Sequence, residues 1–194
     1  MNDVLYDGFW TRVQLPPPPP FFFIFMLQRK QIVGKIITYL VEVLEQPREE
    51  FSGFAACPYA KAERVSGDLL IDVYDPSYTT FAQVVKDMED DGYQSGLWAL
   101  FEDDQPVEVE GEYTKKLQNI FNKSLDKNNI EGYQTICINP NDTYSVDEFN
   151  PRGQAPYFLV SIIKKDVLNK AHKNLMQTKY FQNFPDYYKK FLKL

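Results

Sequence analysis

The sequence is poor in cysteine and histidine, the residues that hold small folds together through disulfides or metal ions. Its 194 residues include two cysteines, Cys57 and Cys137, and one histidine, His172. Two cysteines are too few for a disulfide framework, and these three residues lack the spacing of a zinc site. We therefore expect no metal and a reducing, cytoplasmic location. A bridge between Cys57 and Cys137 stays open until their separation is known.

The chain also lacks long apolar runs and an excess of positive charge. No stretch approaches the roughly 20 apolar residues of a membrane-spanning helix, and Asp3 and Asp7 stand where a secretory signal would be basic. There are 21 Lys and Arg against 27 Asp and Glu, which gives a net charge of −6. We expect no membrane association and no general binding to nucleic-acid phosphates.

Residues 1–25 are unusual because they contain five prolines, Pro16 to Pro20, directly before the run Phe21-Phe22-Phe23-Ile24-Phe25. A polyproline run is extended and cannot join a helix or a sheet, so we predict a disordered segment. It could be a ligand for a proline-recognising module. It could equally be the translation of a pyrimidine tract, and our hypothesis is then that Met26 is the true start, which an intact-mass measurement on native protein would test.

Residues 26–178 have the pattern of one α/β domain. Apolar residues at three- and four-residue spacing predict helices from Leu27 to the breaker Pro47, and over 80–88, 112–127 and 166–177. Short apolar runs bounded by Gly, Pro, Asn or Asp predict strands at 69–74, 97–101, 133–138 and 155–163. We expect an α+β two-layer sandwich, a mixed four-stranded sheet with about four helices. The long loop 139–154 is a place to look for function.

The most suggestive stretch is Cys57-Pro58-Tyr59-Ala60. Proline is favoured in the first turn of a helix, so Cys57 could lie at a helix N-terminus where the dipole lowers the thiol pKa, helped by Lys61 and Arg64. The alternative is that Cys57 is a small buried hydrophobic residue, which is the more common role. His172, within a lysine-rich helix, is expected to be solvated or partly packed rather than catalytic.

The motif Cys57-Pro58-Tyr59 resembles the start of a glutaredoxin active site. The segment Ala155-Pro156-Tyr157-Phe158 is similar to the proline segment that faces the thiol in that fold. However, a glutaredoxin has a strand before its cysteine and a long helix after it. The second cysteine of that motif is Ala60 here, and no glycine pair follows Pro156.

A second resemblance covers about residues 27–175. The chain resembles the uncharacterised family called domain of unknown function 1415, in which an amphipathic helix leads to Cys-Pro-Phe-Ala. Its other motifs are similar to Gly132 and Gln134, Asn139-Pro140 and Tyr144, and then Arg152, Pro156 and Tyr157. The family's histidine before the loop proline is Asn139 here, and its later strand histidine is absent. The resemblance implies no known reaction.

Two functions follow as expectations. In the first, the Cys57-Pro58-Tyr59 segment and the loop 152–157 form a pocket for a small anionic ligand, with Cys57 as a catalytic thiol and Arg152 as anion anchor. Further ligand contacts would come from Tyr59, Gln134, Tyr144, Pro156 and Tyr157, and no cofactor is predicted. In the second, the protein is a non-catalytic interaction module that meets a protein partner through its aromatic, basic tail (179–194), with Cys57 in the core. Such tail aromatics also serve to fasten a chain end to its domain.

Overall fold

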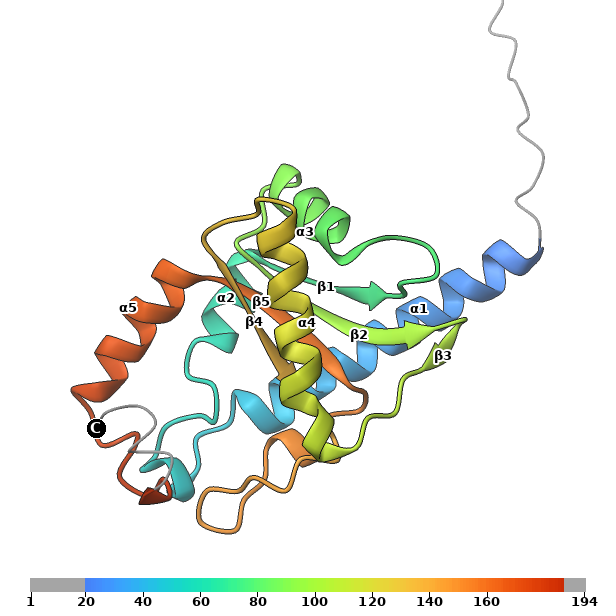
Figure 1. Cartoon of the computed structure of the whole chain (residues 1–194). Coiled ribbons are helices and arrows are strands. Elements are labelled where there is room, and N and C mark those ends of the chain that lie inside the picture. Colours follow the sequence, from blue (N-terminus) through green and yellow to red (C-terminus); the bar gives the residue numbers. More distant parts are fainter. Residues whose placement is uncertain (1–19, 187–194) are drawn as a thin grey trace, which may run out of the picture.

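The computed structural model describes residues 20–186, with side chains from residue 28 onward, and contains a mixed sheet. The strands run in the order β1-β2-β5-β4, and a short β3 pairs with β2 outside this path. Strands β1 and β2 are parallel, whereas β5 is antiparallel to both of its neighbours (Figure 1). The expected mixed sheet is confirmed. The strands are β1 (Leu69–Tyr74), β2 (Ser95–Glu102), β3 (Gln105–Pro106), β4 (Tyr133–Ile138) and β5 (Leu159–Lys164).

The four predicted helices occur in the predicted order, and the described residues add a fifth, short helix, α2. They are α1 (Pro20–Tyr39), continued by a π-helical turn (Leu40–Leu44), α2 (Ala60–Ser66), α3 (Phe81–Asp90), α4 (Thr114–Lys127) and α5 (Lys165–Met176). Single 3-10 turns lie at Glu49–Phe51, Gly111–Tyr113 and Arg152–Gln154. Thr80 caps α3, since its hydroxyl accepts a hydrogen bond from the backbone N–H of Gln83 at 3.2 Å.

The first helix starts earlier than its pattern predicts, at Pro20 rather than Leu27. Proline suits the first helical position because its missing N–H would have no partner there. The helix thus includes residues 20–25, which we expected to be disordered. Residues 1–19 lie outside the described part, and so do the hypotheses about the proline run and the start site.

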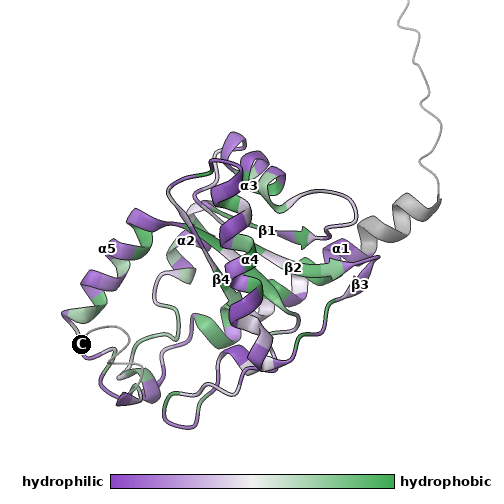
Figure 2. Ribbon diagram, in the orientation of Figure 1, coloured by the Kyte–Doolittle hydropathy of each residue, from purple (hydrophilic) through white to green (hydrophobic). Residues whose placement is uncertain are grey.

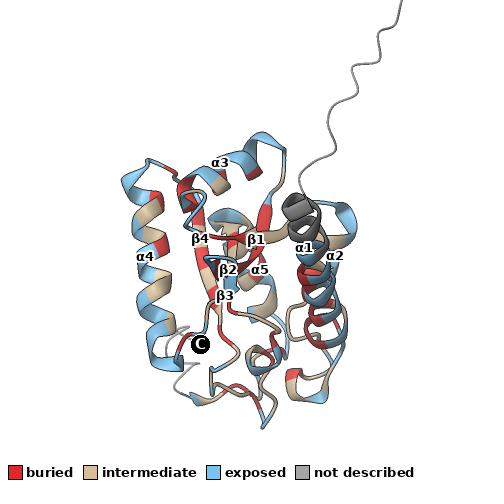
Figure 3. Ribbon diagram, turned by 90° about the vertical axis from the view of Figure 1, so that its right-hand side faces the viewer, coloured by how far each residue is buried: buried red, intermediate tan, exposed pale blue. Residues whose placement is uncertain are grey.

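Helices cover both faces of the sheet, so the domain has three layers where we expected two. Trp98 and Leu100 of β2 pack against α3 and α4. Their neighbours Leu97, Ala99 and Phe101 pack against α1 on the other face. Figure 3 shows the sheet between these two layers, with α3 and α4 on one side and α1 and α2 on the other.

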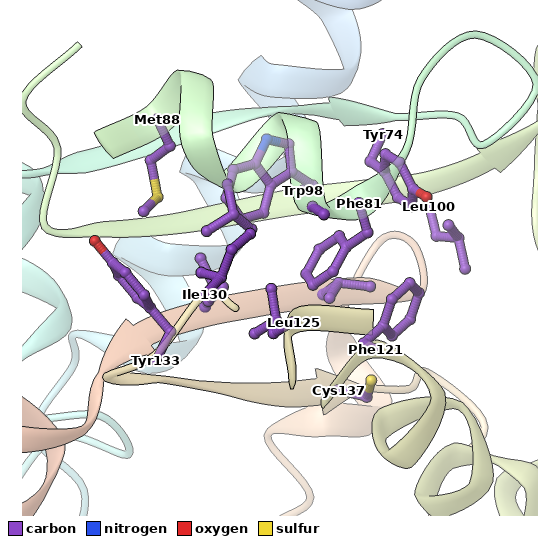
Figure 4. Packing of buried hydrophobic residues seen from close by; sticks show 14 of the residues in the cluster. Tyr74, Phe81, Met88, Trp98, Leu100, Phe121, Leu125, Ile130, Tyr133 and Cys137 are labelled. Carbon is purple, nitrogen blue, oxygen red and sulfur yellow. The ribbon is translucent and has the colours of Figure 1, made fainter. Parts of the chain in front are cut away.

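The core between the sheet and α3–α4 is built around Trp98, which is 1 % exposed. Phe81 of α3 and Phe121 of α4 meet beside it with ring centres 4.7 Å apart (Figure 4). The indole lies over Gly96, where an added Cβ would come within 2.0 Å of a ring carbon. The strands are accordingly hydrophobic while the helices turn polar surfaces outward (Figure 2).

The described part of the aromatic tail forms a third small core. Tyr180 and Phe184 are buried against Phe51, with ring centres 5.6 and 5.7 Å from it. The Tyr180 hydroxyl also donates to the carbonyl of Ala56 at 2.6 Å. Up to residue 186 these aromatic rings fasten the chain end to the domain. None of the helices in the described residues is long and apolar enough to cross a membrane.

Candidate functional site

Cys57 does not lie at a helix N-terminus. Helix α2 begins at Ala60, and Cys57 precedes it in a turn that its own carbonyl closes by accepting the Ala60 N–H at 3.2 Å. The Cys57 N–H donates to the carbonyl of Leu44 at 2.9 Å, which ties the segment to the end of the first helix. The half-buried side chain packs against the α1-side core.

The surroundings of Cys57 keep its thiol protonated. Burial raises the pKa of Cys57, and the nearby Glu63 and Glu45 raise it further, against the lowering effect of the Ala60 and Tyr59 N–H groups. Arg64, expected to supply positive charge, binds Glu45 through two hydrogen bonds of 2.6 and 2.8 Å. The expected lowering of the thiol pKa is therefore wrong, and a nucleophilic role for Cys57 stays a prediction that these charges oppose.

The two cysteines cannot form a bridge. Cys137 lies in the core between the sheet and α3–α4, while Cys57 packs on the α1 side of the same sheet. Both are free thiols. Burial raises the pKa of Cys137 to about 12.

The side chain of Arg152 binds residues of its own loop. Its Nη1 donates to Asp142 Oδ2 at 3.0 Å, and its guanidinium lies 5.6 Å from the ring centre of Tyr144. The side chain of Asn150 joins the same loop by accepting the Gly153 N–H at 2.8 Å and donating to the Asp142 carbonyl. Arg152 and Tyr144 thus brace the loop 139–154.

Tyr39 links the two regions that the sequence singled out. Its hydroxyl is buried and donates to the carbonyl of Pro151 at 3.0 Å, directly before Arg152. Burial raises the pKa of Tyr39, Cys57 raises it further, and Arg152 lowers it, so both residues act electrostatically on this phenol. Tyr39 carries no sign of this role in the sequence, because it counts as one more apolar position of the first helix.

A groove runs along α1 beside Tyr39. It has a volume of about 640 Å³ and is closed on its other side by Gln154 and Pro156. The ammonium of Lys35, one of its lining residues, lies 5.6 Å from the ring centre of Tyr157. Gly34 is an exposed lining residue without a side chain, and a Cβ there would meet no heavy atom within 4 Å. The residues from the first helix that line the groove are Gln31, Gly34, Lys35, Thr38, Tyr39, Glu42 and Val43.

Other predicted ligand contacts lie elsewhere. The Tyr59 hydroxyl donates to the carbonyl of Ala171 at 3.1 Å and so holds α5. Gln134 pairs with Ile163 near the start of β4, whereas the loop 139–154 follows the opposite end of that strand. His172 is partly packed, as expected, with its ring 5.4 Å from that of Phe181. The predicted residues therefore do not converge on one pocket.

A second cavity, of about 670 Å³, is acidic. It is lined by Pro47, Arg48, Glu49, Glu50, Asp147 and Glu148. The single cation, Arg48, stacks on the ring of Phe149 at 3.8 Å. Four carboxylates against one guanidinium would repel an anion. Within residues 20–186 no group of three or more acidic, Cys or His side chains is arranged to hold a metal ion.

Asn139, where the resemblance suggested by the sequence would place a histidine, is fully buried and has a structural role. Its side-chain amide donates to the Val109 carbonyl at 3.0 Å and to the Thr114 hydroxyl at 2.8 Å.

Comparison with protein-family models, curated proteins and solved structures gave no match to this chain. The resemblance to domain of unknown function 1415 stays a prediction.

Proposed function

We propose that the protein is a non-catalytic binding module that holds a small ligand with an anionic group in the groove along α1. The observation that carries this proposal is Gly34. Glycine in a helix interior costs about 1 kcal/mol relative to alanine, yet here it stands where any side chain would enter the groove. The groove, with a volume of about 640 Å³, is wide open to solvent, so a ligand would lie along the helix rather than be enclosed.

Charge supports a particular orientation of the ligand. Lys35 offers an ammonium to the groove, and Glu42, which also lines it, lies seven positions further along the helix, which is about 10 Å at 1.5 Å per residue. An anionic group would bind beside Lys35 and Tyr157, and a hydrogen-bond donor or amino group would bind near Glu42. Zwitterionic amino-acid derivatives and dipeptides have this chemistry.

This proposal changes the roles that the sequence suggested. Lys35 replaces Arg152 as the anion anchor, because Arg152 is already paired with Asp142. Pro156 and Tyr157 remain beside the ligand. Cys57 belongs to the packing behind the site, as in the non-catalytic alternative, and its protonated thiol supports binding without covalent chemistry.

The test is a nuclear magnetic resonance titration of the full chain with a panel of dipeptides, N-acetyl amino acids and simple dicarboxylates. The expected result is saturable amide shifts along residues 31–43 and 154–157 for at least one compound. Lys35→Ala should weaken binding about tenfold, or by 1.4 kcal/mol. Gly34→Leu should abolish it while the fold stays stable.

Lys116→Ala is the matched control, since it removes an exposed lysine from α4 on the other face of the sheet. Binding that resists Gly34→Leu, or shifts that gather at the acidic cavity instead, would refute the proposed site.

A further inference from the structure

Strand β1 forms an open edge of the sheet. The carbonyl of Asp68 accepts the N–H groups of Gln94 and Ser95 at 2.9 and 3.1 Å, so the backbone of alternate residues from Asp68 onward points toward β2. Leu69, Ile71 and Val73 must therefore point their N–H and C=O groups away from β2. The Val73 N–H is taken by Asp72 Oδ1 at 2.7 Å, but no other described residue bonds the Ile71 N–H or the carbonyls of Leu69 and Ile71.

The opposite edge, β4, is closed. Its outward N–H groups at Thr135 and Cys137 donate at 3.1 Å to the side-chain oxygens of Asn122 and Gln118. Both acceptors come from α4, which packs along this strand. An unprotected strand edge is a template for pairing with another strand. Of these two edges, β1 is therefore the one that is left available for pairing with another strand.

One strip of α1, made of an arginine and two apolar residues, lies beside this edge. Arg29, Val33 and Ile37 recur at four-residue spacing and so share one side of the helix. The Arg29 guanidinium binds the carboxylate of Asp72, which places this side of α1 at the edge of β1. Val33 is half-buried and Ile37 is 38 % exposed, so both present apolar surface beside the β1 edge. The groove residues lie on the other side of the same helix.

We propose that β1 and this strip of α1 form the interface of a symmetric dimer with a second copy of the chain. The two β1 strands would pair antiparallel about a two-fold axis at Ile71, which joins both sheets into one. In this register Ile71 faces its own copy and Leu69 faces Val73, so that apolar residues meet on the α1 side of the sheet. Such an interface is self-complementary, as two-fold symmetry requires.

The charges at this edge suit a second copy although the whole chain carries −6. Each copy brings one positive and one negative side chain, Arg29 and Asp72, so the joint is neutral and Arg29 can pair with either carboxylate. The side chains of this ion pair are 43 % and 17 % exposed. Arg29 is the half-exposed member, and ion pairs at the surface contribute little to stability, so Arg29 can move aside for the incoming strand at small cost.

Sedimentation velocity of the full chain over a concentration series tests the proposal. The expected result is a concentration-dependent species of twice the 22.7 kDa chain mass. Ile37→Lys and Ile71→Pro should each raise the dimer dissociation constant by about tenfold or more. Ile71→Pro removes an outward N–H together with a side chain that packs against the α1-side core, so circular dichroism checks that each variant is folded.

The matched control is Ile120→Lys, the same chemical change at a 51 % exposed position of α4, which should leave the dimer intact. Register is tested by Ile71→Cys, because hydrogen-bonded antiparallel partners have Cα atoms about 5.5 Å apart, close enough for a disulfide. A chain that stays monomeric up to its solubility limit overturns the proposal, as does a dimer that survives both interface variants or fails to cross-link. Because Ile37→Lys and Ile71→Pro lie outside the groove, ligand binding should persist in both.

Discussion

Replacing Gly34 by alanine should stabilise the protein by about 1 kcal/mol, the helix-propensity difference between these residues in an exposed helix interior. Three observations indicate that the protein should gain the full helix-propensity difference between glycine and alanine. Gly34 is exposed and within α1. Its backbone is not in the left-handed region, and an added methyl group would have no heavy atom within 4 Å. The methyl group therefore adds no strain, and it reduces the conformational entropy of the unfolded chain.

Urea unfolding followed by circular dichroism measures this change, and calorimetry should show a melting temperature higher by about 2–4 °C for a chain of this size. Thr38→Ala is a useful companion, because the Thr38 hydroxyl donates to the Gly34 carbonyl at 3.1 Å from the same exposed face. Unchanged or reduced stability in Gly34→Ala would show that the helix is distorted at this position. The argument that glycine is kept there for the groove would then fail.

Four further results are expected. The free energy of unfolding should fall as pH rises above about 8.5, the ordinary thiol pKa. The cause is Cys137, whose pKa is raised to about 12, so that its thiol stays protonated in the folded protein while it ionises in the unfolded chain. Cys137→Ala should therefore reduce the dependence of stability on pH, measured by urea titrations at pH 7 to 9.5. Cys57 should react with a thiol reagent much more slowly than a free thiol at pH 7.5, since burial raises its pKa, and fast labelling of the folded protein would contradict the site described here. Gly96→Ala should destabilise by about 1–3 kcal/mol in chemical denaturation, because its Cβ would lie 2.0 Å from Trp98, and a neutral effect would show that the indole can move. Arg29→Ala should change the unfolding free energy by less than about 1 kcal/mol, because the Arg29 side chain is 43 % exposed, and a larger loss would mean that this pair holds α1 in place.

The strands could be predicted from the sequence because their limits are set locally. β1 is bounded by Gly67 and Pro76, and β4 by Gly132 and Pro140, so the predicted and observed strands agree. The predicted strand 155–163 begins only at Leu159, since Pro156 has no N–H for a ladder. The three layers also had a local signal. Leu97 to Phe101 are five consecutive apolar residues, a pattern typical of a strand that is buried on both faces.

The site could not be predicted in the same way because its contacts join distant segments. Tyr39 donates to a carbonyl 112 positions away, and nothing in its neighbourhood marks it as different from the other residues of its helix. The neutralisation of Arg64 depends on Glu45, 19 positions earlier and beyond a proline turn. Arg152 is paired by Asp142 inside an irregular loop, where no periodicity states which side chains meet.

The position of β5 has a consequence for how the chain is made. β5 lies between β2 and β4, although of the strands in residues 20–186 it is the last to be synthesised. Until residues 159–164 have left the ribosome, β2 and β4 have no partner on their facing edges, and the earlier segments cannot complete a sheet. Contacts between distant segments also slow folding. We therefore expect folding to begin only after most of the chain has been translated, so that nascent chains ending before β5 should be protease-sensitive and should depend on chaperones.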